Sequence, residues 1–276
     1  LLRLLPPQEQ LAVHTCGTDH RTALVSRLLQ RQCVATLLGQ SGQPLPFDEV
    51  RIGRTRGNKP FDATPRRGLV SAEHNFNFNV SYNSELVVLA SDPALLIGLH
   101  LCTPFMSTFE SIRDEYSGVM SAREWDAFEV LPTEGERLMA FSKAWTAKLA
   151  FVKARGDGAS FPLSTVEVSF VGTTQQLRST ARSSSAPLGT VAQSERQAEA
   201  TDDGRIWGQP ATVAECSGHG EVGPRLKVAE TSVATLSVYS EEKLMPLPLW
   251  LITLQCIGEG PLPCCLIATA RGPVSA

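Results

Sequence analysis

The sequence of 276 residues has no CxxC pair, no large excess of either charge and no long uninterrupted apolar run. Its seven cysteines are odd in number, and without CxxC spacing they indicate neither a disulfide framework nor a zinc ribbon. The net charge of −3 provides no basic field for a nucleic-acid backbone, so we expect no nucleic-acid partner. These absences favour a cytoplasmic protein with reduced thiols.

The apolar run at residues 244–270 is interrupted by prolines and a glutamate, which a membrane-spanning helix would tolerate poorly. We therefore interpret it as buried strands and expect no membrane partner. The sequence begins at Leu1 rather than at a methionine, and residues 1–7 are too short for the apolar region of a signal peptide plus its cleavage site. We expect further residues before Leu1, and an organellar location is the alternative to the cytoplasmic one.

With 42% hydrophobic and 19% charged residues, the composition is that of an ordinary globular protein with one or two compact domains. From Gly172 to about Ser232 the sequence turns to Ser, Thr, Gln, Ala and Gly, with few large apolar side chains. This composition predicts a long low-complexity insertion, either a loop or disordered. Apolar segments return near residues 250–256 and 264–270, where we expect strands.

Residues 18–38 have the pattern of an amphipathic helix that begins at a Thr-Asp pair, two good capping residues. The apolar side chains of this segment recur at roughly helical spacing: Leu24, Leu28, Val34, Leu37 and Leu38. Three arginines, Arg21, Arg27 and Arg31, lie off this apolar stripe. For Arg27 and Arg31 a solvated basic face is an alternative to a functional part.

The loop at residues 51–60 contains three cations in six positions, Arg54, Arg56 and Lys59. They lie next to a Gly-Asn pair, and Asn58, like glycine, tolerates a left-handed turn. Cations beside a tight turn are suited to binding phosphates. A solvated basic loop is the alternative interpretation of this segment taken alone.

Residues 76–81 alternate aromatic and polar side chains as a strand does, and residues 82–84 supply turn chemistry before the apolar segment 86–90. This pattern predicts a β-hairpin.

A further strand is expected at residues 95–102, where alternation places Gly98, His100 and Cys102 on one face. That face is the expected place of a site. A hydrogen-bonded histidine and a small buried thiol facing a cleft are the alternative for the last two residues.

Residues 103–118 read as a polar connection, and residues 121–125 carry a Ser-x-x-Glu capping box. A longer helix is predicted over residues 134–155, because apolar side chains recur on one side and Gly156 follows its end. A strand is then expected at residues 161–170.

The blocks at residues 76–81, 95–102 and 145–153 resemble, in order and spacing, the 4'-phosphopantetheinyl transferases of the broad-specificity type. The resemblance covers roughly residues 18–170. It implies an α+β fold of two related halves with pseudo-twofold symmetry. Each half would be a small antiparallel sheet with helices, with the active-site cleft between them. We place the halves at residues 1–92 and 93–276.

The resemblance also implies roles for individual residues. The residues expected to bind coenzyme A are Arg21, Arg54, Lys59, Ser81 and Tyr82, the last in place of the family's histidine. Lys148 and Lys153 fall on the catalytic lysines of the helix motif, in which Trp145 is expected to belong to the core. The family reaction needs coenzyme A as co-substrate and Mg²⁺, and its acceptor is a serine of an acyl or peptidyl carrier protein.

Three positions depart from the family pattern. His100 stands at the aspartate that is the principal metal ligand, Cys102 at a second ligand position and Leu149 at the glutamate that is both ligand and candidate base. Magnesium prefers oxygen ligands, whereas imidazole and thiolate suit zinc and later transition metals. The expected Mg²⁺ ligands are therefore not retained, and His100 is the remaining candidate metal ligand.

Three hypotheses follow from the resemblance and its departures. The first is a monomeric phosphopantetheinyl transferase of lipid biosynthesis, impaired by the altered metal site. The second is a catalytically silent protein that binds coenzyme A or a carrier domain. The third is a divergent gene product whose site has collapsed.

Overall fold

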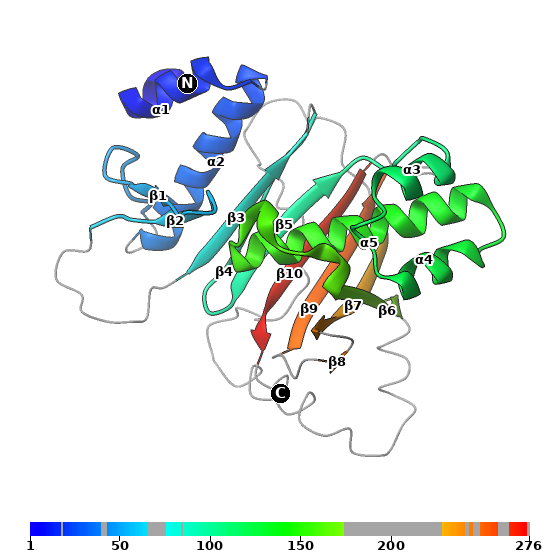
Figure 1. Cartoon of the computed structure of the whole chain (residues 1–276). Coiled ribbons are helices and arrows are strands. Elements are labelled where there is room, and N and C mark those ends of the chain that lie inside the picture. The colour runs from blue at the N-terminus through cyan, green and yellow to red at the C-terminus, as the bar shows by residue number, and fades with distance from the viewer. Residues whose placement is uncertain are drawn as a thin grey trace.

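The structure is a computed structural model of the chain (Figure 1). It describes residues 1–17, 19–39, 43–65, 76–83, 85–173, 228–240, 243–244, 249–258 and 265–274. Most of the insertion expected at residues 172–232 lies outside these ranges. Its two ends do not: residues 172–173 and 228–232 belong to strands, so the expected limits were too wide.

The α-helices among the described residues are α1 (Pro7–Thr15), α2 (His20–Leu38), α3 (Phe109–Glu115), α4 (Ala122–Glu129) and α5 (Glu134–Arg155). Asp19 caps α2 by accepting a hydrogen bond from the Thr22 amide. Capping boxes begin α4 at Ser121 and α5 at Thr133, and the first of these was predicted. The α5 helix ends at Gly156, whose φ of 83° favours glycine.

The strands are β1 (Ile52–Arg54), β2 (Pro60–Asp62), β3 (Asn77–Tyr82), β4 (Val87–Asp92), β5 (Leu96–Cys102), β6 (Val166–Thr173), β7 (Val228–Ser240), β8 (Lys243–Leu244), β9 (Leu249–Ile257) and β10 (Cys265–Val274). The largest sheet has the order β5-β10-β9-β7-β6, and β8 pairs with β7. The pairs β1-β2 and β3-β4 form separate antiparallel hairpins. The chain thus combines helices with antiparallel sheets, as the sequence predicted.

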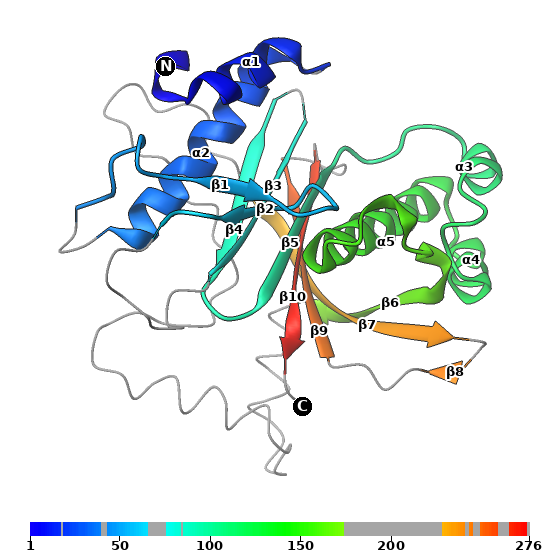
Figure 2. The ribbon, with the colours of Figure 1, turned by 60° about the vertical axis from the view of Figure 1, so that its left-hand side comes forward.

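Helix α5 lies across one face of the large sheet (Figure 1; Figure 2). Gly98 of β5 allows this close approach, because a Cβ there would lie 2.0 Å from the Ala150 carbonyl oxygen. Ala147, Ala150 and Ala154 are buried on α5. Small side chains on the helix and glycine on the strand therefore bring β5 and α5 into direct contact.

The β3-β4 hairpin lies beside β5 (Figure 2), and side chains rather than a backbone ladder join the two. The Leu99 amide donates to Asn79 Oδ1 over 3.0 Å, and the Leu101 amide donates to Ser81 Oγ over 3.1 Å. Both Asn79 and Ser81 are buried. These bonds satisfy amides of β5 that face away from β10, so β3 acts as a substitute for a neighbouring strand.

Some sequence predictions need correction. Residues 103–118, expected as a polar connection, contain α3, since Thr108 caps that helix and its Phe109 and Ile112 are buried. The strand expected at residues 161–170 begins only at Val166, after a 3₁₀ turn. Helix α1 was not predicted at all. Among the described residues no helix is long and apolar enough to cross a membrane.

Candidate functional site

The basic loop predicted between Arg51 and Pro60 is the turn of the β1-β2 hairpin. Asn58 has a φ of 65°, so it adopts the left-handed turn that the sequence predicted. The Lys59 ammonium reaches the end of α5, where it donates a 2.7 Å hydrogen bond to the Ala154 carbonyl. A cation at this position complements the helix dipole and satisfies a carbonyl that the helix leaves without an internal partner.

The same turn contacts the end of α5 through its backbone. A Cβ at Gly57 would lie 2.1 Å from the Gly156 carbonyl oxygen, so glycine is needed for the contact. Burial lowers the pKa of Lys59 to about 8. Lys59 and the backbone of the turn therefore form a fixed contact between the β1-β2 hairpin and α5. Arg54 and Arg56 are exposed, so the alternative of a solvated basic loop holds for these two side chains.

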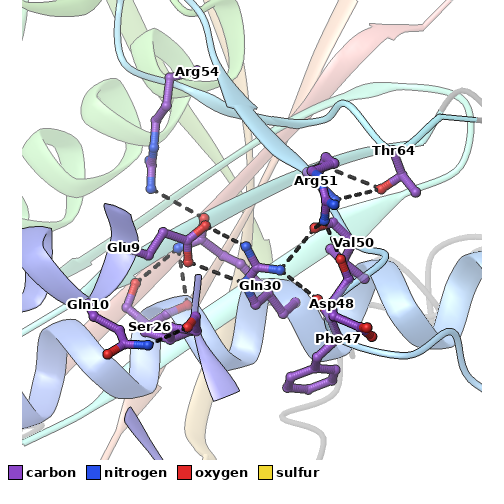
Figure 3. Close-up of polar contacts among 12 residues, drawn as sticks. Glu9, Gln10, Ser26, Gln30, Phe47, Asp48, Val50, Arg51, Arg54 and Thr64 are labelled. Carbon is purple, nitrogen blue, oxygen red and sulfur yellow. Dashed lines mark hydrogen bonds and ion pairs between the residues drawn. The ribbon is translucent and has the colours of Figure 1, made fainter. Parts of the chain in front are cut away.

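Arg54 lies on the other side of this turn and points toward α2 (Figure 3). Its guanidinium is within 3.4 Å of the Asn58 carbonyl and 3.5 Å of Gln30 Oε1, two long contacts. Burial lowers the pKa of Arg54, and the nearby charge of Arg27 lowers it further. Tyr82, an exposed residue, also interacts with Arg54 electrostatically. Gln30 was not expected in the site; its only sequence signal was its place on the polar side of α2.

Arg31 does not lie on a solvated basic face, so that alternative was wrong for this residue. Its side chain is only 1% exposed and binds the Glu9 carboxylate through two nitrogens, over 2.7 and 3.2 Å. It also donates to the carbonyls of Phe47 and Val50. Arg31 therefore fixes α1 and the segment before β1 on α2.

Lys153 lies on α5, where its ammonium donates a 3.1 Å hydrogen bond to Ser81 Oγ. Burial lowers the pKa of Lys153 to about 8. Among the described residues no carboxylate lies within ion-pair distance of Lys153, Lys59 or Arg54. The structure thus brings together two lysines, Lys59 and Lys153, without a carboxylate partner among the described residues, whereas the charge of Glu9 partly offsets the desolvation of Arg54.

His100 lies on β5 close to Lys153. Burial, and then the charge of Lys153, lower the pKa of His100 to about 3, so the imidazole is neutral at physiological pH. Its Nδ1 atom is buried and finds no hydrogen-bond partner in the part of the chain that the structure describes. The expectation that His100 is hydrogen-bonded is therefore wrong for this nitrogen. Cys102 Sγ donates to the Thr103 carbonyl over 3.0 Å, and burial raises the pKa of this thiol.

Lys148 lies in a different environment, completely buried between α5, α4 and the chain before β6. Its ammonium contacts Glu124 Oε2 over 2.5 Å and donates to the carbonyls of Val119 and Leu163 over 3.0 and 3.1 Å. Trp145 packs in an aromatic cluster and stacks against Phe141, as expected of a core residue. These contacts favour a structural part for Lys148.

A chain of contacts joins most of the predicted site residues. Arg54 contacts the loop of Lys59, Lys59 contacts α5 next to Lys153, and Lys153 contacts Ser81. Tyr82 follows Ser81 at the end of β3 and is exposed. Two predicted residues lie outside it. Lys148 is held by Glu124, and Arg21 is exposed on the first turn of α2 with no described contact to this group.

Two family models match this chain. One, described as 4'-phosphopantetheinyl transferase, N-terminal, matches residues 1–94, and the other, described as 4'-phosphopantetheinyl transferase superfamily, matches residues 106–200. The matches follow one another and together span more than half of the sequence. The chain belongs to the 4'-phosphopantetheinyl transferase superfamily. The resemblance seen in the sequence is thereby confirmed.

Curated relatives support the same assignment to the phosphopantetheinyl transferases. L-aminoadipate-semialdehyde dehydrogenase-phosphopantetheinyl transferase of Rattus norvegicus is 29% identical over 172 residues, which are 60% of this chain and 53% of the rat protein. The protein of the same name from Xenopus laevis is 30% identical over 59% of this chain and 52% of its own length. A phosphopantetheinyl transferase of Thraustochytrium is 29% identical over 153 residues, 52% of this chain and 49% of the relative. The chain thus spans about half the length of these relatives.

The superfamily implies a divalent metal. The residues of this chain at the ligand positions predicted from the sequence do not fit Mg²⁺. The three aligned positions offer a neutral imidazole, a protonated thiol and the hydrocarbon of Leu149. The Lys153 ammonium lies beside the imidazole and would repel a cation. Over the described ranges, no three His, Cys, Asp or Glu side chains gather where they could hold a metal ion.

Proposed function

We propose that this chain is a 4'-phosphopantetheinyl transferase that moves phosphopantetheine from coenzyme A to a serine of an acyl or peptidyl carrier domain. The observation that carries the proposal is the pair of partly buried lysines, Lys59 and Lys153, together with the exposed Arg54, none of which has an ion-pair partner among the described carboxylates. Desolvating a positive charge without a counterion costs free energy. A ligand with several phosphates would offset that cost at all three positions.

The arrangement of the neutral groups supports the same ligand. Ser81 contacts Lys153, and Tyr82 follows it at the end of β3 with an exposed side chain; the hydroxyls of both can donate to phosphate oxygens. Charge-assisted hydrogen bonds from lysine and arginine are the strong contacts in phosphate recognition. The exposed Arg21 would add a contact at the rim, as in the family. Lys148 then acts as a positioning residue that holds α5 through Glu124.

We also propose that residues 1–92 and 93–276 form two halves related by a pseudo-twofold axis, with the site in a cleft between them. Each part has a long helix against antiparallel strands: α2 packs on β3 and β4, and α5 packs on β5 and β10. The cations come from both parts, because Arg54 and Lys59 precede the proposed boundary and Lys153 follows it. The ligand would accordingly bind where the parts meet.

In the proposed reaction the carrier serine oxygen attacks the β-phosphate of coenzyme A. A new O–P bond forms, the bond to the bridging oxygen breaks, and 3',5'-ADP leaves with the electron pair while the serine proton passes to solvent. Lys153, Lys59 and Arg54 stabilise the negative charge that the phosphates carry through the transition state. We place this reaction in lipid biosynthesis, in a cytoplasmic monomer.

A second candidate function is a catalytically silent protein that binds coenzyme A or a carrier domain. The observation that favours it is the absence of a carboxylate at residues 100, 102 and 149, which leaves no side chain there to act as base. Such a protein would keep the cationic site and lose the chemical step.

Two measurements test these proposals. Incubation with coenzyme A and an apo-carrier domain should add the mass of one phosphopantetheine group to the carrier serine, and a bound but unreacted cofactor would support the silent protein instead. Coenzyme A should bind more tightly than dephospho-coenzyme A, and its affinity should fall with salt because the contacts are charge-assisted. Equal and salt-independent binding of the two compounds would contradict a phosphate site.

A further inference from the structure

The position at which the family would place a metal ion is next to a fixed positive charge in this chain. The Lys153 ammonium interacts with His100 and is held by Ser81 Oγ, 3.1 Å away. The carboxylate nearest along the chain, Asp157, is bound to Arg155 over 2.5 Å on the surface. A divalent cation at this position would therefore meet repulsion from Lys153 and no oxygen anion to offset it.

His100 supplies an unused hydrogen-bonding atom at the same place. Its Nδ1 is buried without a partner among the described residues, which costs free energy unless a ligand or water occupies the position. The side chain as a whole is only partly covered, as are those of Lys153 and Leu149, so a ligand can approach the open edge of the imidazole, and a rotation of the ring would present Nδ1 to it. A neutral imidazole that carries its proton on Nδ1 can donate to a phosphate oxygen without taking up a proton.

Ser81 supplies a third donor. Its oxygen already accepts two hydrogen bonds, from the Leu101 amide and from Lys153, each over 3.1 Å. Its hydroxyl hydrogen has no described acceptor and is available for an oxygen of a ligand. Ser81 thus contacts Lys153, and His100 lies near the same ammonium. Two neutral donors and one ammonium match a phosphate and do not match a metal ion.

We propose that this chain binds the diphosphate of its ligand directly through Lys153, Ser81 and His100, and that no divalent ion is needed for that binding. The identity of the ligand as coenzyme A rests on the proposed function, whereas the metal-free anion site rests on the donors alone. Lys153 provides the charge compensation that a metal ion would otherwise supply, although one ammonium carries half the charge of Mg²⁺. Arg54 and Lys59 add charge on the other side of the ligand.

The test is calorimetric titration of the full chain with coenzyme A and, separately, with inorganic pyrophosphate. Each is measured in EDTA and in MgCl₂ at matched ionic strength. We expect dissociation constants that agree within about threefold between the two conditions, because the donors and not a metal hold the phosphates. Lys153→Gln should weaken both ligands about tenfold or more in EDTA, the usual size of a charge-assisted hydrogen bond, and His100→Phe should weaken them less.

The matched control is Lys143→Gln, the same exchange ten residues earlier on α5 and about 15 Å away along the helix. It should leave both affinities unchanged, and circular dichroism should show that all variants are folded. Coenzyme A binding that requires MgCl₂ would overturn the metal-free site while leaving the proposed function intact. Pyrophosphate binding in EDTA without coenzyme A binding would support the anion site and contradict the proposed function. Binding of neither ligand would overturn both.

Discussion

Two lysines of one helix, Lys148 and Lys153, show how differently the same side chain can be used. Lys148 is completely buried and its ammonium has three partners, one of them the carboxylate of Glu124. Lys153, five residues later, is partly buried and has a serine oxygen as its partner. The first charge is compensated within the described protein, and the second is not.

The presence or absence of a counterion distinguishes a structural role from a binding role better than the residue type does. Both lysines fall on motif positions of the family, and the sequence therefore predicted a catalytic part for both. A buried ion pair with all its hydrogens bonded holds elements together, here α4 and α5. A desolvated ammonium without a counterion raises the free energy of the unliganded folded state, and binding of an anion removes that cost.

The largest expected effect is on the transfer rate, when carboxylates are introduced by substitution near Lys153. His100→Asp and Leu149→Glu together should raise the rate of pantetheine transfer to an apo-carrier domain in magnesium. Each recovered interaction is worth about a hundred- to a thousandfold. Each single change should recover little, because a metal site and the base it positions act as one unit. Robust activity of the unaltered chain, or a double variant that binds coenzyme A and stays inert, would contradict this account.

Substitution of the two lysines is expected to change the free energy of unfolding differently. Lys148→Met leaves the Glu124 carboxylate buried without its cation and should lower the free energy of unfolding by about 3–5 kcal/mol. Lys153→Met removes an uncompensated charge and should leave stability equal or higher. Urea denaturation of the two variants and the parent gives the three values. Equal losses for both lysines would remove the distinction between the two regions.

Asn79 and Ser81 allow a smaller and more specific test, since both side chains satisfy amides of β5. Replacement of either by alanine leaves a buried amide unpaired and should cost about 1–3 kcal/mol of stability. Ser81→Ala should also weaken coenzyme A binding, because Lys153 loses its anchor and the ligand loses a donor. Asn79→Ala is the control, and a loss of affinity as large as that of Ser81→Ala would show that both residues act only through the fold.

The smallest expected effect is the dependence of stability and coenzyme A affinity on pH. Burial lowers the pKa of Lys59 and Lys153 from 10.5 to about 8 in the folded chain. Between about pH 8 and 10.5 the unfolded chain then binds more protons than the folded chain, so stability should rise with pH across that window. Coenzyme A affinity should fall in the same window, because the ammonium form binds phosphate. Lys153→Met should remove part of both slopes, and flat profiles for the parent would contradict uncompensated lysines.

Much of the fold follows from local sequence signals. Helix α5 runs over the predicted residues 134–155, because a capping box begins it and a glycine in left-handed conformation ends it. The hairpin of β3 and β4 and the late strands β9 and β10 also lie where alternation and apolar runs placed them. The chain reversal at Asn58 was readable because few other residues accept its φ.

What the sequence could not show depends on contacts between distant segments. Arg31 lies on the polar side of α2, and only Glu9 and the carbonyls of Phe47 and Val50 make its burial tolerable. The same holds for Lys148, whose partner Glu124 looked like an ordinary capping-box residue. Pairing across 22 or more positions leaves no periodic trace, so buried charges were predicted as solvated or catalytic.

The side-chain bridge from β3 to β5 also covers an edge of the large sheet. Strand β5 is an outer strand of the large sheet, and the amides of Leu99 and Leu101 point outward from it. An open strand of this kind is a template for pairing with another chain and for aggregation. The side-chain oxygens of Asn79 and Ser81 accept the hydrogen bonds of those amides, so an incoming strand cannot form a backbone ladder with them. The β3-β4 hairpin therefore also protects this edge, and a chain in which the hairpin failed to dock would expose β5 to pairing with other strands during synthesis.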